Sequence, residues 1–207
     1  MATFKSIHNR LIQIPAPLLP PASPHDAALT SEIASLQLHP TLETILHVLN
    51  LDLPSAHFLV RHMQSAPAFE GMYLHGILHR IEGDYDNARA WYSDVKESDI
   101  YAKIWGKEGH TWKDWKEKDS DNRQSLDEGQ KFLDAVQRFK ETKGKEGDKA
   151  ALEGQSRREL DETTRWCVER FGTHKMVDAS SAWVKASDEI RKMGEDQVNG
   201  DSGRRKF

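Results

Sequence analysis

The chain of 207 residues has a single cysteine, Cys167, and therefore no internal disulfide. This excludes a small secreted scaffold held together by disulfides and favours a reducing compartment. Cys167 lies in the sequence WCVERF, among large apolar residues. Because a reactive thiol needs an exposed and electropositive setting, we expect Cys167 to be a buried core residue rather than a nucleophile.

Long apolar runs and an excess of positive charge are also absent. No run reaches the ~18 apolar residues that can span a bilayer. The net charge is -4 and the pI is near 6.2, whereas a surface that binds nucleic acid needs concentrated positive charge. We therefore expect neither a membrane nor a nucleic acid as partner, and a soluble cytoplasmic protein is the simplest interpretation.

Two short signals leave other compartments open. The residues before Asp26 include Lys5 and Arg10 but no acid, which is typical of mitochondrial transit peptides. Residues 204–206 form a short basic tip of the kind found in nuclear addresses.

Persistent alternation of apolar and polar residues, the pattern of half-buried strands, is missing as well, which predicts an all-α fold. Five prolines between Pro15 and Pro24 exclude a continuous helix there, so we expect residues 1–25 to lie extended on the surface. Residues 26–193 are predicted to form one compact bundle of about six to eight helices, and residues 194–207 a flexible polar tail.

Capping residues and apolar residues three or four apart predict the helices themselves. Expected helix starts are Asp26, Pro40, Asp52, Pro67, Asp84, Ser125, Asp148 and Asp178. Ser125 and Glu128 together match a capping box. The helix after Asp52 should turn Phe58, Leu59 and Met63 to the core, and the helix after Asp178 should do so with Trp183, Ala186, Ile190 and Met193. The remaining tryptophans Trp105, Trp112 and Trp115 are expected to pack against the rest of the bundle.

A central helical hairpin is the strongest local prediction. Its first helix carries a stripe of aliphatic residues, Leu74, Ile77, Leu78 and Ile81, and Gly83 should end that helix. Gly76, Gly83, Ala88 and Tyr92 stand where a single tetratricopeptide repeat has its small, turn and aromatic residues, so the hairpin resembles one such unit. No second copy follows near 34 residues away, so a full peptide-binding solenoid is not expected.

Polar residues with metal-ligand spacing accompany this hairpin. His75 and His79 are four residues apart and Glu82 follows three later, so all three project from one side of a helix. Two imidazoles at this spacing can bind one zinc, iron or manganese ion, Glu82 or Asp84 can add a carboxylate, and His57 from the preceding helix can complete the site.

The same residues suit two other interpretations. Without a metal, His57 or His75 could transfer a proton while Arg80 binds an anionic substrate and Glu82 takes part in acid/base catalysis. Alternatively, Arg80, Glu82 and Asp84 form a capping and salt-bridge cluster between two helices, which accounts for the acids but not for the histidines. His62, five residues from His57, points elsewhere and belongs to neither site.

A family resemblance covers residues 55–92. It rests on Ser55, His57, His75, His79, Arg80, Glu82, Asp84, Asn87, Trp91 and Tyr92. These resemble the pattern of an uncharacterised family of bacteria and eukaryotes: a Ser-His pair, a histidine, three residues, His-Arg, two acids, an asparagine and an aromatic pair. In bacterial members the serine directly precedes the histidine, whereas Ala56 intervenes here. The family has no assigned activity, so the resemblance implies a shared polar site but no particular reaction.

Two functions follow from these observations. The first is a binding or adaptor protein that holds a partner peptide or small-molecule ligand in grooves beside residues 54–95. The second is a metal-dependent or acid/base enzyme acting on a small polar substrate, with His57, His75, His79 and Glu82 as ligands or proton carriers.

Overall fold

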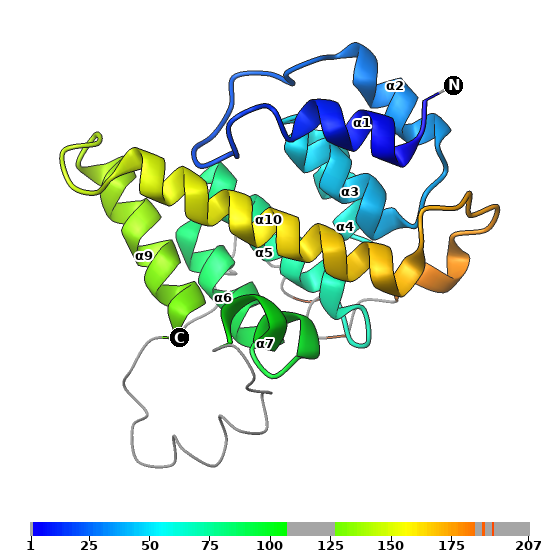
Figure 1. Cartoon of the computed structure of the whole chain (residues 1–207). Coiled ribbons are helices and arrows are strands. Elements are labelled where there is room, and N and C mark those ends of the chain that lie inside the picture. Colours follow the sequence, from blue (N-terminus) through cyan, green and yellow to red (C-terminus); the bar gives the residue numbers. More distant parts are fainter. Residues whose placement is uncertain (1, 107–126, 185–187, 189–191, 193–207) are drawn as a thin grey trace.

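The structure is a computed structural model that describes residues 2–106, 127–184, 188 and 192 (Figure 1). Over these residues the fold is a compact all-α bundle, with no strand beyond an isolated parallel bridge between Met63 and Val184. This confirms the predicted fold class. None of the described helices combines the length and the apolar character that a membrane span requires.

One helix, α5 (Phe69–Glu82), lies at the centre of the bundle, and almost every residue from Glu70 to Ile81 is buried. Four helices pack against it: α3 (Pro40–Leu49), α4 (Leu53–Val60), α6 (Tyr85–Val95) and α7 (Asp99–Trp105). The predicted stripe of Leu74, Ile77, Leu78 and Ile81 is fully buried among them. The surrounding helices must therefore pack against the polar as well as the apolar side chains of α5.

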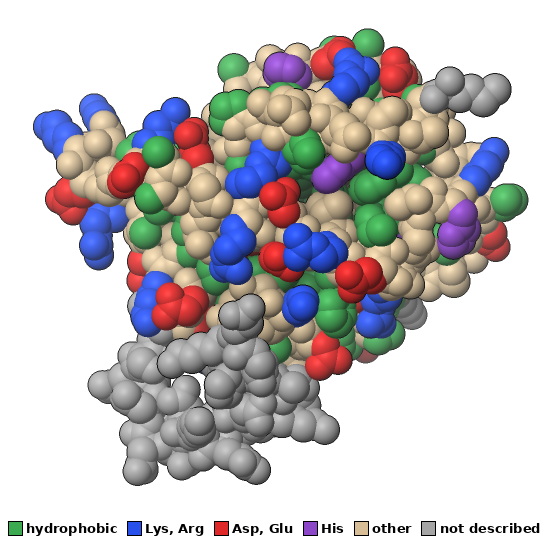
Figure 2. All heavy atoms as spheres, viewed as in Figure 1, with side chains coloured by type: hydrophobic (Ala, Val, Ile, Leu, Met, Phe, Trp, Pro, Cys, Tyr) green, Lys and Arg blue, Asp and Glu red, His purple; other side chains and the backbone are tan. Residues whose placement is uncertain are grey.

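The outer helices complete the bundle. They are α1 (Phe4–Leu11) and α2 (Ala28–Ser35), which cover α3, together with α9 (Glu128–Glu141), which packs on α6, and α10 (Lys149–Phe171), which packs on α3, α7 and α9. The long helix α10 runs across the front of the molecule in Figure 1. Figure 2 shows acidic and basic side chains intermixed on that face, in keeping with the ion pairs along α10 between residues three or four apart.

Most of the predicted caps are present. Asp52, Asp84 and Asp148 each accept a hydrogen bond from a backbone N–H in the first turn of α4, α6 and α10. Gly83 ends α5 with φ of 82°, a left-handed conformation that favours glycine. Asp26 accepts from the backbone N–H of Ala28 at the start of α2. Cys167 is fully buried, as expected, and burial raises the pKa of its thiol.

The amino-terminal prediction was wrong in part. The proline segment is not helical, as expected, but residues 4–11 form α1, capped by Thr3. Ile7 and Leu11, one helical turn apart, are buried in the core together with Leu18 from the proline segment. Residues 1–25 are therefore not an extended surface segment, because their few apolar side chains anchor them to the bundle.

Three other predictions were wrong in detail. Leu59 and Met63 are buried as predicted, but Phe58 is 66% exposed, and Leu53, Ala56 and Val60 complete the buried side of α4. Asp127 rather than Ser125 caps α9, by accepting from the backbone N–H of Gln130. Residues 178–184 form no α-helix: a 3-10 turn, Ser180–Ala182, leads to an extended stretch. Ser125, Trp112, Trp115, Ala186, Ile190, Met193 and residues 194–207 lie outside the described residues.

Close packing of α5 on α6 depends on Gly76. A Cβ atom at this position would lie 2.9 Å from Cδ2 of Tyr92 and 3.0 Å from Cβ of Trp91. The absence of a side chain therefore lets the two helices of the hairpin approach closely around the buried Tyr92 ring. The likeness to a tetratricopeptide unit stays a prediction.

A buried polar network joins α5 to α10. The guanidinium of Arg80 and the carboxylate of Glu159 are both fully buried, 2.7 Å apart. Tyr73 and Tyr92 donate their hydroxyls to Oε1 of Glu159, and Trp105 donates its indole N–H to the Tyr73 oxygen. Burial and the Glu159 charge raise the pKa of both tyrosines well above the usual value, so the phenols stay protonated donors.

We expect Arg80→Met to lower the free energy of unfolding by about 3–5 kcal/mol, because it leaves the Glu159 carboxylate buried without its counter-charge. Urea unfolding followed by circular dichroism measures this change. The control is Arg89→Met, which breaks the partly exposed pair with Asp134 and should cost under about 1 kcal/mol. Equal losses in the two variants would contradict this account of the network.

His39 makes the stability dependent on pH. Its ring stacks on Phe171 with the centroids 3.7 Å apart, and burial, aided by the charge of Arg170, lowers its pKa to about 4 from 6.5. The unfolded chain binds a proton more readily than the folded one between these values. The contribution of His39 to the free energy of unfolding is therefore complete above pH 6.5. It decreases as the pH falls below 6.5 and is lost as the pH falls through about 4.

His39→Asn should flatten this dependence, because asparagine can still cap α3 but does not titrate. We expect the fall in unfolding free energy between pH 7 and pH 4 to shrink by about 1–2 kcal/mol, a value discounted for the partial exposure of the ring. Urea unfolding at a series of pH values tests this. An unchanged slope in the variant would show that His39 is not the group responsible.

Candidate metal and proton-transfer site

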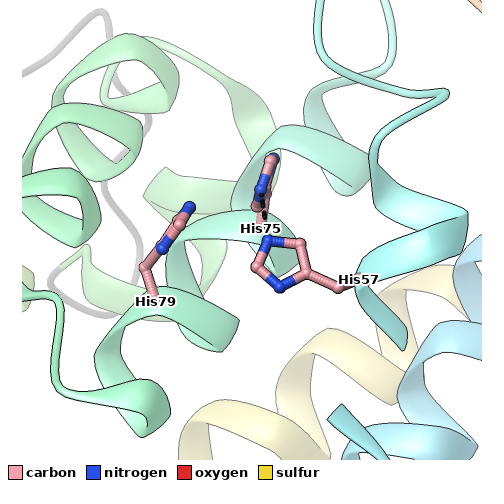
Figure 3. Close-up of side chains that lie close together, drawn as sticks. All are labelled: His57, His75 and His79. Carbon is pink, nitrogen blue, oxygen red and sulfur yellow. Dashed lines mark hydrogen bonds between the residues drawn. The ribbon is translucent and has the colours of Figure 1, made fainter. Parts of the chain in front are cut away.

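Three histidines from two packed helices meet at one point. His57 lies on α4, which begins after the Asp52 cap, and His75 and His79 lie one turn apart on the facing side of α5. Figure 3 shows the ring of His57 reaching from α4 toward the two rings on α5. The predicted convergence of these three residues is therefore present in the structure.

The rings form a nearly equilateral triangle. The centroid of His57 lies 4.8 Å from that of His75 and 5.1 Å from that of His79, and the last two are 4.8 Å apart. One nitrogen from each ring can be chosen so that all three lie within 4.8 Å of one another. His75 is buried, while the side chains of His57 and His79 are 15% exposed. Solvent thus reaches the site from the side of His57 and His79.

A chain of hydrogen bonds runs through two of the rings. Nδ1 of His57 lies 3.0 Å from Oε1 of Glu82, and Nε2 of His57 lies 2.9 Å from Nε2 of His75. An ionised carboxylate only accepts, so Nδ1 of His57 carries the proton and, in a neutral ring, Nε2 accepts from His75. Nδ1 of His75 then accepts from the amide of Gln64 at 3.4 Å. One direction of donation, from Gln64 through His75 and His57 to Glu82, satisfies every contact.

His79 lies next to two carboxylates. Its Nδ1 is 3.6 Å from Oε2 of Glu82 and 3.7 Å from Oδ2 of Asp84. These distances exceed a normal hydrogen bond, and this buried nitrogen has no hydrogen-bond partner in the described structure. Burial, reinforced by His57, lowers the pKa of His79 despite the two acids. A neutral His79 keeps a lone pair available for a metal ion or a proton.

Trp91 and Gln64 hold His75 in place. The Trp91 ring of α6 stacks on His75 with the centroids 4.6 Å apart and the planes 24° apart. Trp91 belongs to the pattern that carries the family resemblance, whereas Gln64 was missed by the sequence analysis. Gln64 follows α4 in a loop, where neither helical periodicity nor capping pointed to it.

Arg80 does not bind a substrate here, contrary to prediction. Although adjacent to His79 in sequence, it points into the core, where it pairs with Glu159. A fully buried guanidinium with a counter-charge is unavailable to a ligand at the histidines. The predicted capping and salt-bridge cluster is wrong for Arg80 for the same reason, whereas its capping part is confirmed, because Asp84 caps α6.

Glu82 and Asp84 were predicted as possible metal ligands, but neither belongs to the group of described side chains close enough to bind one ion. Glu82 contacts the Nδ1 side of His57 and His79, and the described residues group only the three histidines closely enough for one ion. Asp84 caps α6 and accepts from the side chain of Asn87 at 2.6 Å. His62 stands apart, as expected, with its ring against Phe58 and Trp183.

Comparison with known proteins finds no matching family model, no matching curated protein and no matching solved structure. The function is therefore inferred from the geometry of the site.

We predict a specific pair of tautomers in metal-free protein at neutral pH. Long-range ¹H–¹⁵N NMR spectra should show His57 protonated at Nδ1 and His75 protonated at Nε2, because with both rings neutral only this arrangement satisfies the chain from Gln64 to Glu82. In Glu82→Ala the preference at His57 should disappear, whereas Glu32→Ala, at an exposed residue of α2, should leave it intact. The opposite tautomers in the wild type would contradict the chain.

Proposed function

We propose that the chain is a metal-dependent enzyme acting on a small polar substrate, with His57, His75 and His79 as ligands of one divalent transition-metal ion. The observation that supports this is the convergence of three imidazoles from α4 and α5, two of them with limited solvent exposure. Three protein ligands with a remaining open position are the arrangement found in catalytic rather than structural zinc sites.

The donor set narrows the choice of metal. Imidazole nitrogens suit zinc and iron, whereas manganese prefers oxygen ligands, so zinc or iron is favoured over manganese. With metal–nitrogen bonds of about 2.0–2.1 Å, tetrahedral ligand nitrogens lie roughly 3.4 Å apart. The present nitrogens lie within 4.8 Å of one another, so the longest of these separations would have to shorten for all three to bind one ion.

Neighbouring residues fit the needs of such ligands. A histidine ligand commonly donates its second ring nitrogen to a carboxylate, which fixes the ring and strengthens the other nitrogen as a donor. Glu82 already receives this bond from His57. Ligation by Nε2 of His75 requires the proton at Nδ1, so the amide of Gln64 would turn its oxygen toward that nitrogen.

A bound zinc or iron ion would acidify a water molecule in the open position and polarise a substrate oxygen. The side chains of Glu82 and Trp91 would then define where a proton is accepted and which side of the site is closed. Glu82, whose side chain is 33% exposed, is placed to accept a proton near the solvent side of the site, and the Trp91 ring closes the side behind His75.

A metal-free acid/base mechanism is a second candidate, supported by the hydrogen-bond chain itself. Donation from His75 to His57 and on to Glu82 is an arrangement that can move a proton through two rings to a carboxylate. The two candidates differ at one atom, because Nε2 of His75 carries a proton in the chain and must lose it to bind a metal. The earlier hypothesis of a peptide- or ligand-binding adaptor stays an untested prediction.

Metal content separates these candidates. Protein purified without chelator and analysed by inductively coupled plasma mass spectrometry should contain about one equivalent of zinc or iron. The double variant His75→Ala/His79→Ala should lose at least about tenfold in metal affinity, because one remaining imidazole cannot hold the ion.

The matched control is His62→Ala, which removes a histidine of the same region that lies outside the triangle and should keep the full metal content. Circular dichroism verifies that each variant is folded. Metal-free wild-type protein that also takes up no added zinc or iron would exclude the metal centre and leave the proton-transfer chain as the remaining candidate.

A further inference from the structure

The loop between α4 and α5, residues 61–68, supplies one side chain of the histidine site. The amide nitrogen of Gln64 lies 3.4 Å from Nδ1 of His75. Backbone hydrogen bonds within α4 and α5 fix the positions of the histidines, whereas a side chain on a loop needs other contacts to keep its place. Those contacts come from α5 and from the segment that follows α10.

Met63, directly before Gln64, packs against the first turn of α5. Its side chain is buried, and a Cβ atom at Gly71 would overlap Cβ of Met63 and lie 2.9 Å from its carbonyl oxygen. The missing side chain of Gly71 therefore allows the loop to contact the backbone of α5. Because Gly71 stands one helical turn before His75, this contact holds the loop on the same side of α5 as the His75 ring.

The segment after α10 holds the same loop at a second point. Val184 donates its backbone N–H to the carbonyl oxygen of His62 at 2.8 Å, beside the parallel bridge between Met63 and Val184. The ring of Trp183 contacts the ring of His62, with the centroids 5.1 Å apart. One hydrogen bond and one aromatic contact thus join residues 183–184 to the residues that precede Gln64.

Residues 173–184 form a strap on the surface rather than a part of the core. Residues 173–175, 177–178 and 180–181 are exposed, and the strap bonds to the bundle through the N–H of Met176, which donates to the carbonyl oxygen of Gln37. It reaches the bundle again at Ala182, which is buried, and at the two residues that contact the loop. The contacts of Trp183 and Val184 therefore fix the loop more than they fill the interior.

Gln64 suits the metal-free and the metal-bound site alike. Without a metal its amide nitrogen donates to Nδ1 of His75. With an ion on Nε2, Nδ1 of His75 would carry the proton and the amide oxygen of Gln64 would accept it. Both states require the amide to stay within hydrogen-bond distance of the ring, so a contact that fixes the loop acts on His75 without touching it.

We propose that Trp183 and Val184 are positioning residues for the histidine site, because they hold the loop so that Gln64 stays bonded to His75. The effect on metal binding rests on the proposed function. The bond from Gln64 to His75 is present without a metal and can be measured by itself.

The test is the ¹⁵N chemical shift of Nδ1 of His75 in the metal-free full chain, because a hydrogen bond to an unprotonated ring nitrogen shifts its signal. Gln64→Ala removes the donor and gives the value without the bond. Val184→Pro removes the N–H given to His62, and the extended backbone of Trp183, with φ of −80° and ψ of 125°, accepts a following proline. We expect Val184→Pro to move the Nδ1 signal most of the way to the Gln64→Ala value.

Val177→Pro is the matched control in the same strap. Val177 is 88% exposed, and its N–H has no hydrogen-bond partner among the described residues, so the Nδ1 signal should keep its wild-type value. Circular dichroism verifies that each variant is folded. If Val184→Pro does not fold, Trp183→Ala should move the signal in the same direction, and Trp183→Phe, which keeps a ring against His62, should restore it.

Zinc titration gives the second readout. Gln64→Ala should weaken zinc binding about tenfold, and Val184→Pro several-fold, because both remove support from a ligand. An Nδ1 signal at the wild-type value in Gln64→Ala, or in both Val184→Pro and Trp183→Ala, would overturn the proposal. Wild-type protein that takes up no zinc would instead overturn the metal centre, and the Nδ1 signal would still decide whether the strap positions Gln64.

Discussion

The burial of α5 is the constraint on which the rest of the structure depends. This helix is enclosed by α3, α4, α6 and α7, yet its sequence carries glutamate, tyrosine, histidine and arginine as well as aliphatic residues. A buried polar group is costly unless it finds a partner, so each of these side chains requires one from another element. Glu70 finds Trp166, His75 finds His57, and Arg80 finds Glu159.

These partners divide the polar interior into two networks with different properties. Around Glu159, a full positive charge, a full negative charge and two phenols are completely buried and bonded to one another. Such a network stabilises and orients helices, and solvent does not reach it, although Nε of Arg80 is buried there without a hydrogen-bond partner. Around His57, by contrast, the side chains of His57 and His79 are each 15% exposed, and the buried Nδ1 of His79 lacks a hydrogen bond among the described residues. This accessibility is why we propose the second network, and not the first, as the site of chemistry.

Much of the fold could be predicted from the sequence because its determinants are local. Asp52, Asp84 and Asp148 cap their helices through neighbouring backbone N–H groups, and Gly83 provides a conformation that few other residues adopt. The burial of Phe58 and the start of the helix expected after Asp178 were predicted wrongly, because periodicity does not show which face of a short segment has a partner; Asp188 and Lys192, further along, are helical. The helix α1 was not predicted, because only Ile7 and Leu11 of its eight residues are buried, too few for a helical period to be recognised.

The candidate site was predictable to the extent that it lies on one helix. The spacing of His75 and His79 places them on one face of α5, and the short connection to α4 made His57 a plausible neighbour. The true role of Arg80 was hidden, because its partner Glu159 is 79 residues away in sequence. Gln64 likewise depends on the path of a loop that no periodicity describes. Long-range partners decide which polar residues of α5 are structural and which remain available.

X-ray absorption spectroscopy on protein loaded with one equivalent of zinc tests the central claim most directly. Three histidine ligands predict about three nitrogen scatterers near 2.0–2.1 Å with the multiple-scattering features of imidazole. A water molecule in the open position would add one further oxygen scatterer. These imidazole features should diminish by about one third in His57→Ala, which removes one of three rings. A spectrum of oxygen ligands without imidazole, identical in wild type and variant, would contradict a metal centre between α4 and α5.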